Sequence, residues 1–320
     1  MNESSYPQLT IGLRSFSAED PGGWSHMFNL AKAADVAGVD RLIGSDHVVF
    51  GENLEEYARP EIGGQKGGKQ PTGPDGHWLE PLTTMAVIAG MTTRIRLRTQ
   101  ILIAALRRPV VLAKSAATLD VLSGGRLDLG VGVGWQKEEY VAAGLNFEGR
   151  GKLLDHTLDV CQVLWRERRA SFRSDELSFE NIHQMPKPLQ PGGVPIWISG
   201  TIRKTTVRRI VRYGPRWIPW GPDAADPLNS IPRMKDAVLA EGGAVNDFQV
   251  AANLPVVRNA GGDMDIRRSM EVVPAMVAAG VTDFVCNPAL PFGFEAAVDA
   301  LLPLVSAFRE ATGRAGATSS

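Results

Sequence analysis

The sequence predicts one (β/α)8 barrel, or TIM barrel, with a long lid loop after its second strand and an insertion before its fifth. Three observations predict this fold. Strand-like and helix-like apolar patterns alternate strictly, each pattern occurs eight times, and the length of 320 residues fits a barrel of about 200 to over 400 residues. Strict alternation favours parallel strands joined by right-handed crossovers, and eight such units close a barrel.

The eight strand and helix units follow one another along the chain. Short runs of Val, Ile, Leu and Ala predict strands at residues 9–16, 40–45, 95–104, 126–133, 195–199, 216–220, 248–257 and 282–287. Apolar residues spaced three and four apart predict helices at residues 24–37, 80–91, 109–122, 152–165, 203–213, 226–241, 265–279 and 294–311. We expect residues 1–312 to form one domain and residues 313–320 to be a flexible tail.

An open, doubly wound sheet is the alternative architecture. The only sequence that favours it is Gly130-Val-Gly132-Val-Gly134, which resembles a dinucleotide-binding fingerprint. Its spacing is GxGxG instead of GxGxxG, and three other strand and helix units precede it. Residues 130, 132 and 134 share one face of a strand. We therefore expect space beside that face in which a flat ligand could lie.

Two segments interrupt the alternation. Residues 46–78 form a connection that contains seven glycines after the second strand. A loop of this length in a compact domain is usually functional or disordered, and at the carboxyl end of a barrel strand it predicts a mobile lid over the mouth. Residues 168–194 carry two alternating runs, which predict a small surface hairpin.

The composition narrows the class of partner. The 34 basic and 35 acidic side chains leave a formal net charge of −1, so no global field favours nucleic acid or a membrane surface. Cys161 and Cys286 fit neither a disulfide framework nor a zinc site, and we expect two buried thiols in a reducing cytoplasm. No signal peptide or run of about 18 apolar residues is present in this sequence. A cytoplasmic protein with a small-molecule substrate is expected.

In (β/α)8 barrels the catalytic side chains come from the carboxyl ends of the strands. His47 lies at such an end and is the main candidate for a catalytic residue. Its imidazole titrates near neutrality and can give or take a proton, although a packing or capping histidine is the alternative. Asp46 points to the other side of the strand and is expected to hold backbone or cofactor groups. No set of His, Asp and Glu residues has metal-ligand spacing, so no metal is predicted.

Residues 190–222 contain six basic side chains and no carboxylate. Arg203 and Lys204 fall in the first turn of a predicted helix, where a cation opposes the helix dipole unless an anion is bound. The backbone N–H groups of residues 199–202 could bind that anion, and we expect a phosphate there. A solvated helix face is the alternative reading of Lys204, Arg208 and Arg212, which recur every four residues.

A series of motifs in order resembles the bacterial luciferase-like monooxygenase superfamily, in its branch that depends on the deazaflavin coenzyme F420. The motifs are GSDHVV at 44–49, WLEPLTT at 78–84, LAK at 112–114, TLDVLSGGRLDLGVGVGW at 118–135 and GRG at 149–151. The family fold is a (β/α)8 barrel, in agreement with the strand count. Relatives are often homodimers, which makes a homodimer possible here.

The resemblance implies a deazaflavin ring at the barrel mouth, against a bulge in the third strand with a non-prolyl cis peptide that maps onto Gln100-Ile101. It implies that Asp46 contacts the ring and that His47 exchanges the proton over the reacting carbon. The cofactor tail is polyanionic, and its phosphate would lie in a turn that leads into the basic helix. The expected cofactor-binding residues are Asp46, His47, Thr99, Gln100, Ile101, Val133, Gly134, Ser199, Gly200, Thr201, Ile202, Arg203 and Lys204.

The chain departs from some sugar-phosphate dehydrogenases of this branch, which have a catalytic glutamate where Trp135 stands. Trp135, Trp217 and Trp220 therefore suggest a hydrophobic substrate, although barrel packing explains tryptophans equally well. We expect hydride transfer between coenzyme F420 and a small organic substrate. A monooxygenase that uses reduced FMN is the alternative, and a barrel that carries flavin without turnover is a third possibility.

Overall fold

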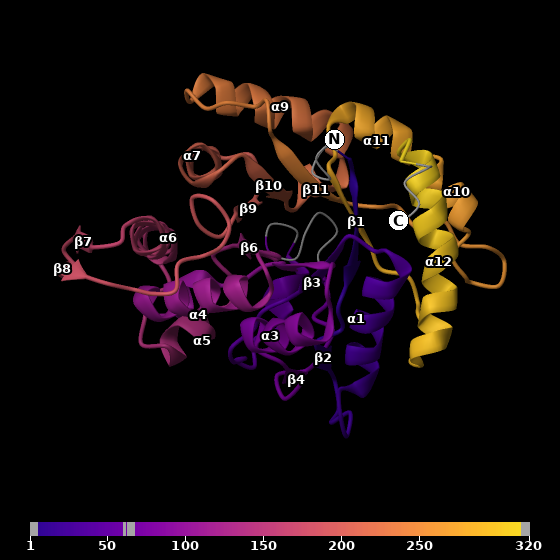
Figure 1. Ribbon diagram of the computed structural model, residues 1–320, viewed down its shortest axis with the longest axis horizontal. Helices are drawn as coiled ribbons and strands as arrows, with labels where there is room; N and C mark the ends of the chain where they lie inside the picture. Colours follow the sequence, from indigo (N-terminus) through magenta and orange to yellow (C-terminus); the bar gives the residue numbers. More distant parts are fainter. Residues whose placement is uncertain (1–5, 60–61, 63–67, 315–320) are drawn as a thin grey trace.

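Eight parallel strands close into a barrel that is surrounded by helices (Figure 1), as the sequence predicts. The computed structural model describes residues 6–59, 62 and 68–314. Around the barrel the strand order is β1, β12, β11, β10, β9, β6, β5 and β3, and β3 pairs with β1 to close the ring. The bounds are β1 Gln8–Gly12, β3 Arg41–Gly44, β5 Arg96–Thr99, β6 Leu127–Val131, β9 Ile196–Gly200, β10 Arg216–Pro219, β11 Gln249–Asn253 and β12 Asp283–Cys286.

The helices cover the outside of the barrel and confirm most of the predicted spans. The main ones are α1 Ser25–Ala37, α3 Pro81–Met91, α4 Pro109–Leu122, α6 Arg150–Arg166, α7 Lys204–Tyr213, α9 Pro227–Ala240 and α12 Phe294–Ala311. The single helix predicted at 265–279 is wrong, because the chain forms α10 Ile266–Met270 and α11 Val273–Ala279. Pro274 lies in the first turn of α11, where its missing N–H prevents one continuous helix. The short helices α5 Lys137–Ala142 and α8 Pro222–Ala225 were not predicted.

Three predicted strands end at least four residues earlier than expected, namely those at 9–16, 95–104 and 248–257. After β1, a separate two-residue strand, β2 Phe16–Ser17, pairs antiparallel with β4 His77–Trp78, and Phe16 stacks on Trp78 with 4.5 Å between ring centroids. After β5, the peptide bond between Gln100 and Ile101 is cis, as the resemblance implies, and the 3-10 helix η3 Ala104–Leu106 follows. The barrel wall is therefore irregular at the point where the family bulge was expected.

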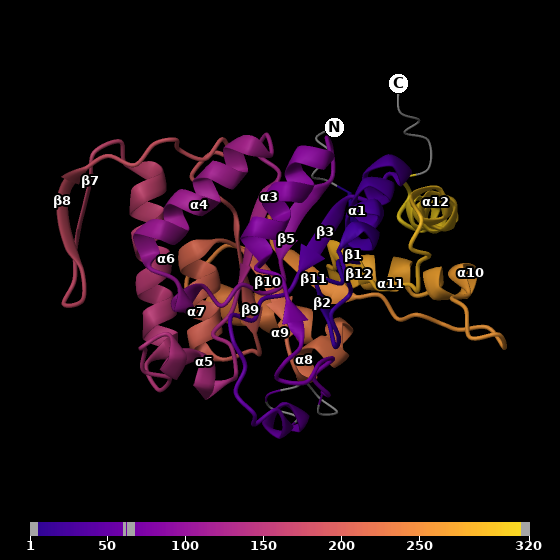
Figure 2. The same ribbon diagram turned by 90° about the horizontal axis from the view of Figure 1, so that it is seen from below.

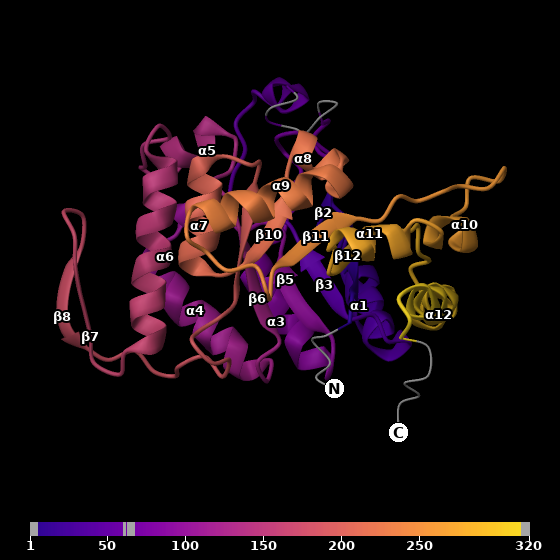
Figure 3. The same cartoon turned by 90° about the horizontal axis from the view of Figure 1, so that it is seen from above.

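The insertion forms a hairpin, as predicted. Its strands β7 Ala170–Arg173 and β8 Ser178–Ile182 pair antiparallel and extend away from the barrel beside α6 (Figures 1 to 3). The described part of the predicted lid contains the 3-10 helix η2 Glu55–Ala58, at the same end of the molecule as α8 (Figures 2 and 3). Residues 60–61 and 63–67 of that loop, and 315–320 of the predicted tail, lie outside the described residues. Arg314 donates to Asp40 Oδ1 at 2.8 Å.

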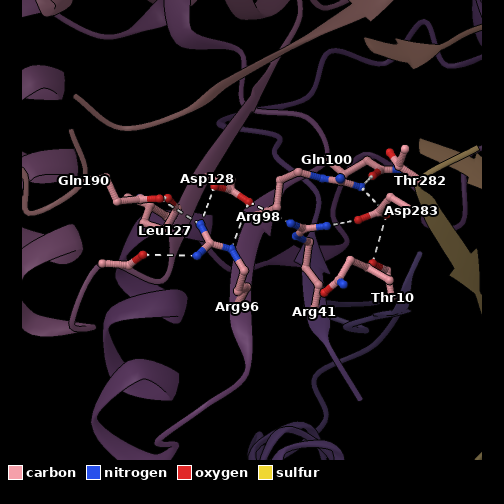
Figure 4. A network of polar contacts seen from close by, with 12 residues as sticks. Thr10, Arg41, Arg96, Arg98, Gln100, Leu127, Asp128, Gln190, Thr282 and Asp283 are labelled. Atoms are coloured by element: carbon pink, nitrogen blue, oxygen red, sulfur yellow. Dashed lines mark hydrogen bonds and ion pairs between the residues drawn. The ribbon is translucent and has the colours of Figure 1, made fainter. Parts of the chain in front are cut away.

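A cluster of charged side chains lies inside the barrel at the amino ends of the strands (Figure 4). We call it the barrel floor, and its members are Arg41, Arg96, Arg98, Asp128 and Asp283. Arg96 and Arg41 donate to opposite oxygens of Asp128 at 2.7 and 3.0 Å. Arg98 is fully buried, donates to Asp283 at 3.2 Å, and lies under the ring of Trp197. Barrel residues at this end usually serve stability.

Burial has opposite consequences for two groups of the floor. Complete burial, reinforced by the nearby Arg41 guanidinium, lowers the pKa of Arg98 well below its usual value. Burial alone would raise the pKa of Asp128, but Arg96 and Arg41 more than offset this effect and lower it. Asp128 is therefore held in its charged form.

Cys161 and Cys286 are free and buried, as expected. Burial raises the pKa of both thiols, that of Cys286 to about 11. Across residues 6–59, 62 and 68–314, every helix is too short or too polar to cross a membrane.

Candidate active site at the barrel mouth

A cavity of about 1150 Å³ lies at the carboxyl ends of the barrel strands. Part of its wall comes from the predicted lid, through residues that include Tyr57, Ile62 and Gln70. The predicted site residues that line it are Asp46, His47, Gln100, Ile101, Val133, Gly134, Trp135, Ser199, Gly200, Thr201, Arg203 and Trp220. The fold therefore brings together residues that are up to 174 positions apart in the sequence, from 46 to 220.

Four predicted site residues do not line this cavity. Thr99 is fully buried and its hydroxyl donates to the Gly130 carbonyl at 2.7 Å. Lys204 is the first residue of α7 and is exposed outside the cavity lining. The backbone N–H of Ile202 is not available for an anion, because it donates to Asp223 Oδ2 at 2.7 Å. The predictions of cofactor contact by Thr99, Ile202 and Lys204 are therefore not supported.

Trp217 was wrongly predicted as a substrate-pocket residue. Successive side chains of a strand point to opposite faces, and Ile218 is the residue of this pair that lines the cavity. Trp217 is 0% exposed, packs in the main hydrophobic core, and donates its indole N–H to the Gly200 carbonyl at 2.8 Å. Trp135 and Trp220 do line the cavity.

His47 follows β3 and lies in an aromatic enclosure. Its ring centroid lies 4.3 Å from that of Phe50, 4.8 Å from that of Trp78 and 6.2 Å from that of Trp135. Its Nδ1 lies 3.3 Å from Oε2 of Glu139, a fully buried carboxylate on α5. Sequence reasoning missed Glu139 because α5 was not predicted. A recognised helix there would have placed an acidic pair in its first turn, close to the strand end.

Asp46 holds the backbone, as expected. Its Oδ2 accepts from the Ile103 N–H at 2.8 Å, and both carboxylate oxygens accept from the Arg107 guanidinium at 2.7 and 3.0 Å. Arg107 also donates to Glu80 at 2.8 Å and was not recognised in the sequence. Asp46 thus fixes the irregular segment after β5 from the neighbouring strand.

The glycines at the end of β6 and just after it make room for the neighbouring chain segment. A side chain at Gly130 would collide with the Thr99 carbonyl oxygen, 2.0 Å from an ideal Cβ. At Gly132 the nearest atom would be Ile101 Cδ1 at 2.8 Å, and at Gly134 Ile103 Cδ1 at 3.1 Å. Thr99, Ile101 and Ile103 thus fill the places that side chains at these glycines would take, and room for a ligand beside this face exists only where Gly132 and Gly134 line the cavity.

Four of the six basic side chains in the stretch 190–222 fall into two groups. Arg208 and Arg212 pair at 2.7 Å with Glu241 and Asp159, so these two belong to a solvated helix face, as the alternative reading had it. Arg203 and Arg209 line the cavity, although Arg209 also pairs with Asp155 at 2.6 Å. Local charge counting therefore overestimated the free positive charge.

The amino end of α7 contributes backbone donors to the same wall. Arg203 precedes the helix without a side-chain cap, and no acidic residue lies in the first turn. No hydrogen bond from the backbone N–H of Lys204, Thr205 or Thr206 to another described residue is found. These unpaired groups and the helix dipole favour an anion.

Two further donors lie in the cavity wall. Trp135 Nε1 and Arg150 Nε are buried and make no hydrogen bond within the described part of the chain. Arg150 lies over the Phe147 ring, 3.8 Å from its centroid. Buried donors normally have partners, so these two are candidates for contact with a bound molecule. The residues that the structure describes contain no group of three His, Cys, Asp or Glu side chains suited to a metal ion.

Comparison with known proteins gives a family model and a relative that match this chain. A model of the luciferase-like monooxygenase family matches residues 11–263. An uncharacterised protein of Mycobacterium tuberculosis is 33% identical over 140 residues, which are 44% of this chain and 49% of that protein. The matched segment thus spans about half the length of this relative.

Solved structures share the fold at low sequence identity. An F420-dependent secondary alcohol dehydrogenase in complex with an F420–acetone adduct has a TM-score of 0.71 at 15% identity, over 95% of this chain and 99% of that chain. The oxygenating component of 3,6-diketocamphane monooxygenase from Pseudomonas putida, in complex with FMN, has a TM-score of 0.66 at 14% identity, over 97% and 99%. The same barrel thus occurs with two different ring cofactors.

Proposed function

This chain belongs to the luciferase-like monooxygenase family, and from that premise we propose that it transfers a hydride between coenzyme F420 and a small, apolar organic substrate. The observation that carries the proposal is the position of His47. This proton-transfer group lies in the wall of a large cavity that also contains Arg150, Arg203 and the open amino end of α7. A base and an anion site in one cavity suit an anionic redox cofactor.

The residues present fit a deazaflavin with a polyanionic tail. Arg150 and Arg203 lie in the cavity wall, and the unpaired N–H groups at the start of α7 add donors. The buried Trp135 Nε1 and Arg150 Nε also lack partners among the described residues, so a ligand rich in acceptor oxygens would satisfy them. We expect Asp46, Gln100, Ile101, Val133 and Gly134 to surround the ring, and Ser199, Gly200 and Thr201 the phosphate.

When bound, the deazaflavin supplies or accepts the hydride. His47 handles the proton that accompanies it. For reduction of a carbonyl, the substrate carbon gains the hydride and His47 gives a proton to the substrate oxygen, so that an alcohol forms. For oxidation, the alcohol carbon loses the hydride and His47 takes the hydroxyl proton. Phe50, Trp78 and Trp135 around His47 exclude water and favour an apolar substrate.

A monooxygenase that uses reduced FMN is the second candidate. The observation that favours it is the similarity to the FMN-bound camphane monooxygenase component over nearly the whole chain. Both activities would use the same cavity. The cationic wall supports the deazaflavin, because its tail carries more negative charge than the single phosphate of FMN.

Titration of the apoprotein with each cofactor separates the two candidates. We expect coenzyme F420 to bind at least tenfold more tightly than FMN, a difference of about 1.4 kcal/mol. Fluorescence quenching or calorimetry at constant salt concentration measures both dissociation constants. Tight binding of FMN without binding of F420 would overturn the proposal.

A further inference from the structure

Two buried polar atoms at the barrel mouth have only each other to face. His47 Nδ1 and Glu139 Oε2 lie 3.3 Å apart, and neither atom makes a hydrogen bond within the described residues. The Glu139 side chain is 0% exposed and that of His47 only 10%. A buried polar atom without a partner costs about 1–3 kcal/mol. A hydrogen bond between these two atoms would give each of them a partner.

The carboxylate of Glu139 is fixed independently of His47. Its other oxygen, Oε1, accepts from the Val48 backbone N–H at 2.9 Å. Gln136, one turn earlier, accepts from the Gly51 N–H at 3.1 Å, and the Tyr140 hydroxyl donates to the Val133 carbonyl at 2.6 Å. Hydrogen bonds on both sides of Glu139 thus fix the segment after β6. The bond of Gln136 joins it to the segment after β3, and the bond of Tyr140 joins it to the end of β6.

The imidazole ring is held from its other sides by aromatic groups. Phe50 lies against it and the Trp78 ring meets it nearly edge-on, at an interplanar angle of 83°. The neighbouring Asp46 is occupied by Arg107. The remaining ionisable side chains of the cavity near the lid are Glu56, Tyr57 and Arg59, and no contact between them and His47 is found. Among the ionisable side chains named here, Glu139 is therefore the one in contact with the ring of His47.

We propose that Glu139 is the positioning residue of His47. Its carboxylate accepts the Nδ1–H of the neutral imidazole, which leaves Nε2 as the atom that exchanges a proton with the bound substrate. The catalytic part of this inference rests on the proposed function, whereas the position of the proton on the ring does not. An acidic group that fixes the tautomer of a catalytic histidine recurs on unrelated folds.

The tautomer is measurable without cofactor or substrate. The chain has only five histidines, so the apoprotein labelled with 15N-histidine gives few signals, and a His47→Asn variant assigns those of His47. We expect Nδ1 to be protonated and Nε2 unprotonated at a pH where the ring is neutral. A wild-type His47 that carries its proton on Nε2 would overturn the proposal, and this measurement needs no folded Glu139 variant.

Glu139→Gln tests the cause. Its amide oxygen can keep the Val48 bond while its NH2 group faces Nδ1, which would move the ring proton to Nε2. The matched control is Glu176→Gln, because Glu176 is exposed and lies 3.9 Å from Nε2 of His156. We expect the tautomer of His47 to change only in Glu139→Gln, in protein whose other amide signals are unchanged. An unchanged His47 tautomer in the folded variant would contradict the proposal.

The catalytic consequence is a separate readout. If the proposed hydride transfer holds, Glu139→Gln lowers kcat by about 10²-fold or more, alters its pH profile, and leaves the cofactor dissociation constant unchanged. Glu139→Asp keeps the charge and should restore part of kcat. If wild-type protein shows the predicted tautomer but no hydride transfer, the proposed function fails and the role of Glu139 on the ring stands. If kcat falls without a change of tautomer, positioning by Glu139 is refuted.

Discussion

The two ends of the barrel place different partners beside their buried carboxylates. At the barrel floor each carboxylate, Asp128 or Asp283, faces at least one guanidinium group of the same cluster (Figure 4). At the mouth, the buried carboxylate of Glu139 faces the imidazole of His47 at 3.3 Å. A guanidinium seldom gives up its proton, whereas an imidazole gains or loses one near neutral pH. The difference teaches that the floor suits a fixed structural role and the mouth suits proton exchange.

The two ends meet at one side chain. Gln100 lines the cavity, and its Oε1 accepts from Arg98 of the floor at 2.6 Å. Since an amide has one acceptor end and one donor end, this bond directs the NH2 group away from Arg98. The floor therefore orients at least one polar group of the mouth.

The largest effect is expected at the mouth, from His47→Asn. We expect kcat to fall by about 10²- to 10⁴-fold, because asparagine cannot exchange a proton near neutral pH. The cofactor dissociation constant should change less than about threefold, since the loss concerns the reaction and not ground-state binding. Steady-state kinetics and cofactor titration measure the two quantities. A wild-type protein that binds cofactor and turns over no substrate in any condition would indicate a carrier.

Asp128→Asn should act on stability instead. The change leaves the buried Arg41 and the partly exposed Arg96 with less opposing charge, so we expect the free energy of unfolding to fall by about 3 kcal/mol or more. Arg212→Gln, which breaks an exposed ion pair with Asp159, is the control and should cost at most about 1 kcal/mol. Denaturant unfolding gives both values. A variant of normal stability with weakened cofactor binding would break the division between floor and mouth.

Arg203→Ala and Lys204→Ala separate neighbours that were predicted to act together. Arg203 lines the cavity and Lys204 does not. Loss of a charge-assisted contact to a phosphate costs about 1.5–3 kcal/mol, so Arg203→Ala should weaken cofactor binding by roughly 10- to 100-fold, and less at high salt. Lys204→Ala should leave the affinity nearly unchanged. Equal effects of both substitutions on cofactor affinity would mean that the cofactor tail binds outside the described cavity.

The fold was predictable because its signals are local. Strands and helices leave their own periodicities, and strict alternation limits the topology to few choices. The errors arose where a single residue decides the outcome. Pro274 divides the predicted seventh helix, and Phe16 leaves the barrel to stack on Trp78. The short α5 is only six residues long, too short for a helical period to stand out.

The site was predictable in position but not in its contacts. Strand ends identified His47 and Asp46 correctly as cavity residues. Their partners are distant in sequence: Glu139 is 92 positions from His47 and Arg107 is 61 from Asp46. The same limitation misled the charge count, because Arg209 pairs with Asp155 on another helix. The face to which Trp217 points depends on the phase of β10, which the unbroken apolar run Trp217-Ile218-Pro219 does not reveal.

The smallest effect is expected from Asp35→Asn, at the edge of the floor. Asp35 lies in the last turn of α1 and accepts hydrogen bonds from the backbone N–H groups of Thr93, Arg94 and Ile95, just before β5, at 2.8, 3.1 and 2.7 Å. Burial alone would raise the pKa of Asp35, but these three bonds more than offset it and lower the pKa. The charged carboxylate therefore stabilises the folded chain above its ordinary pKa, and this contribution disappears as the pH falls through the lowered value.

At neutral pH we expect Asp35→Asn to lower the free energy of unfolding by at most about 1 kcal/mol, because solvent screens a half-exposed carboxylate. Urea unfolding at pH 7 and at about pH 3, below the ordinary aspartate pKa, should show the difference from wild type shrinking in acid. A difference that stays the same at both pH values would mean that the shape of the side chain, not its charge, joins α1 to β5. The stability of the fold at this end of the barrel would then depend on charge only at the buried carboxylates of Asp128 and Asp283.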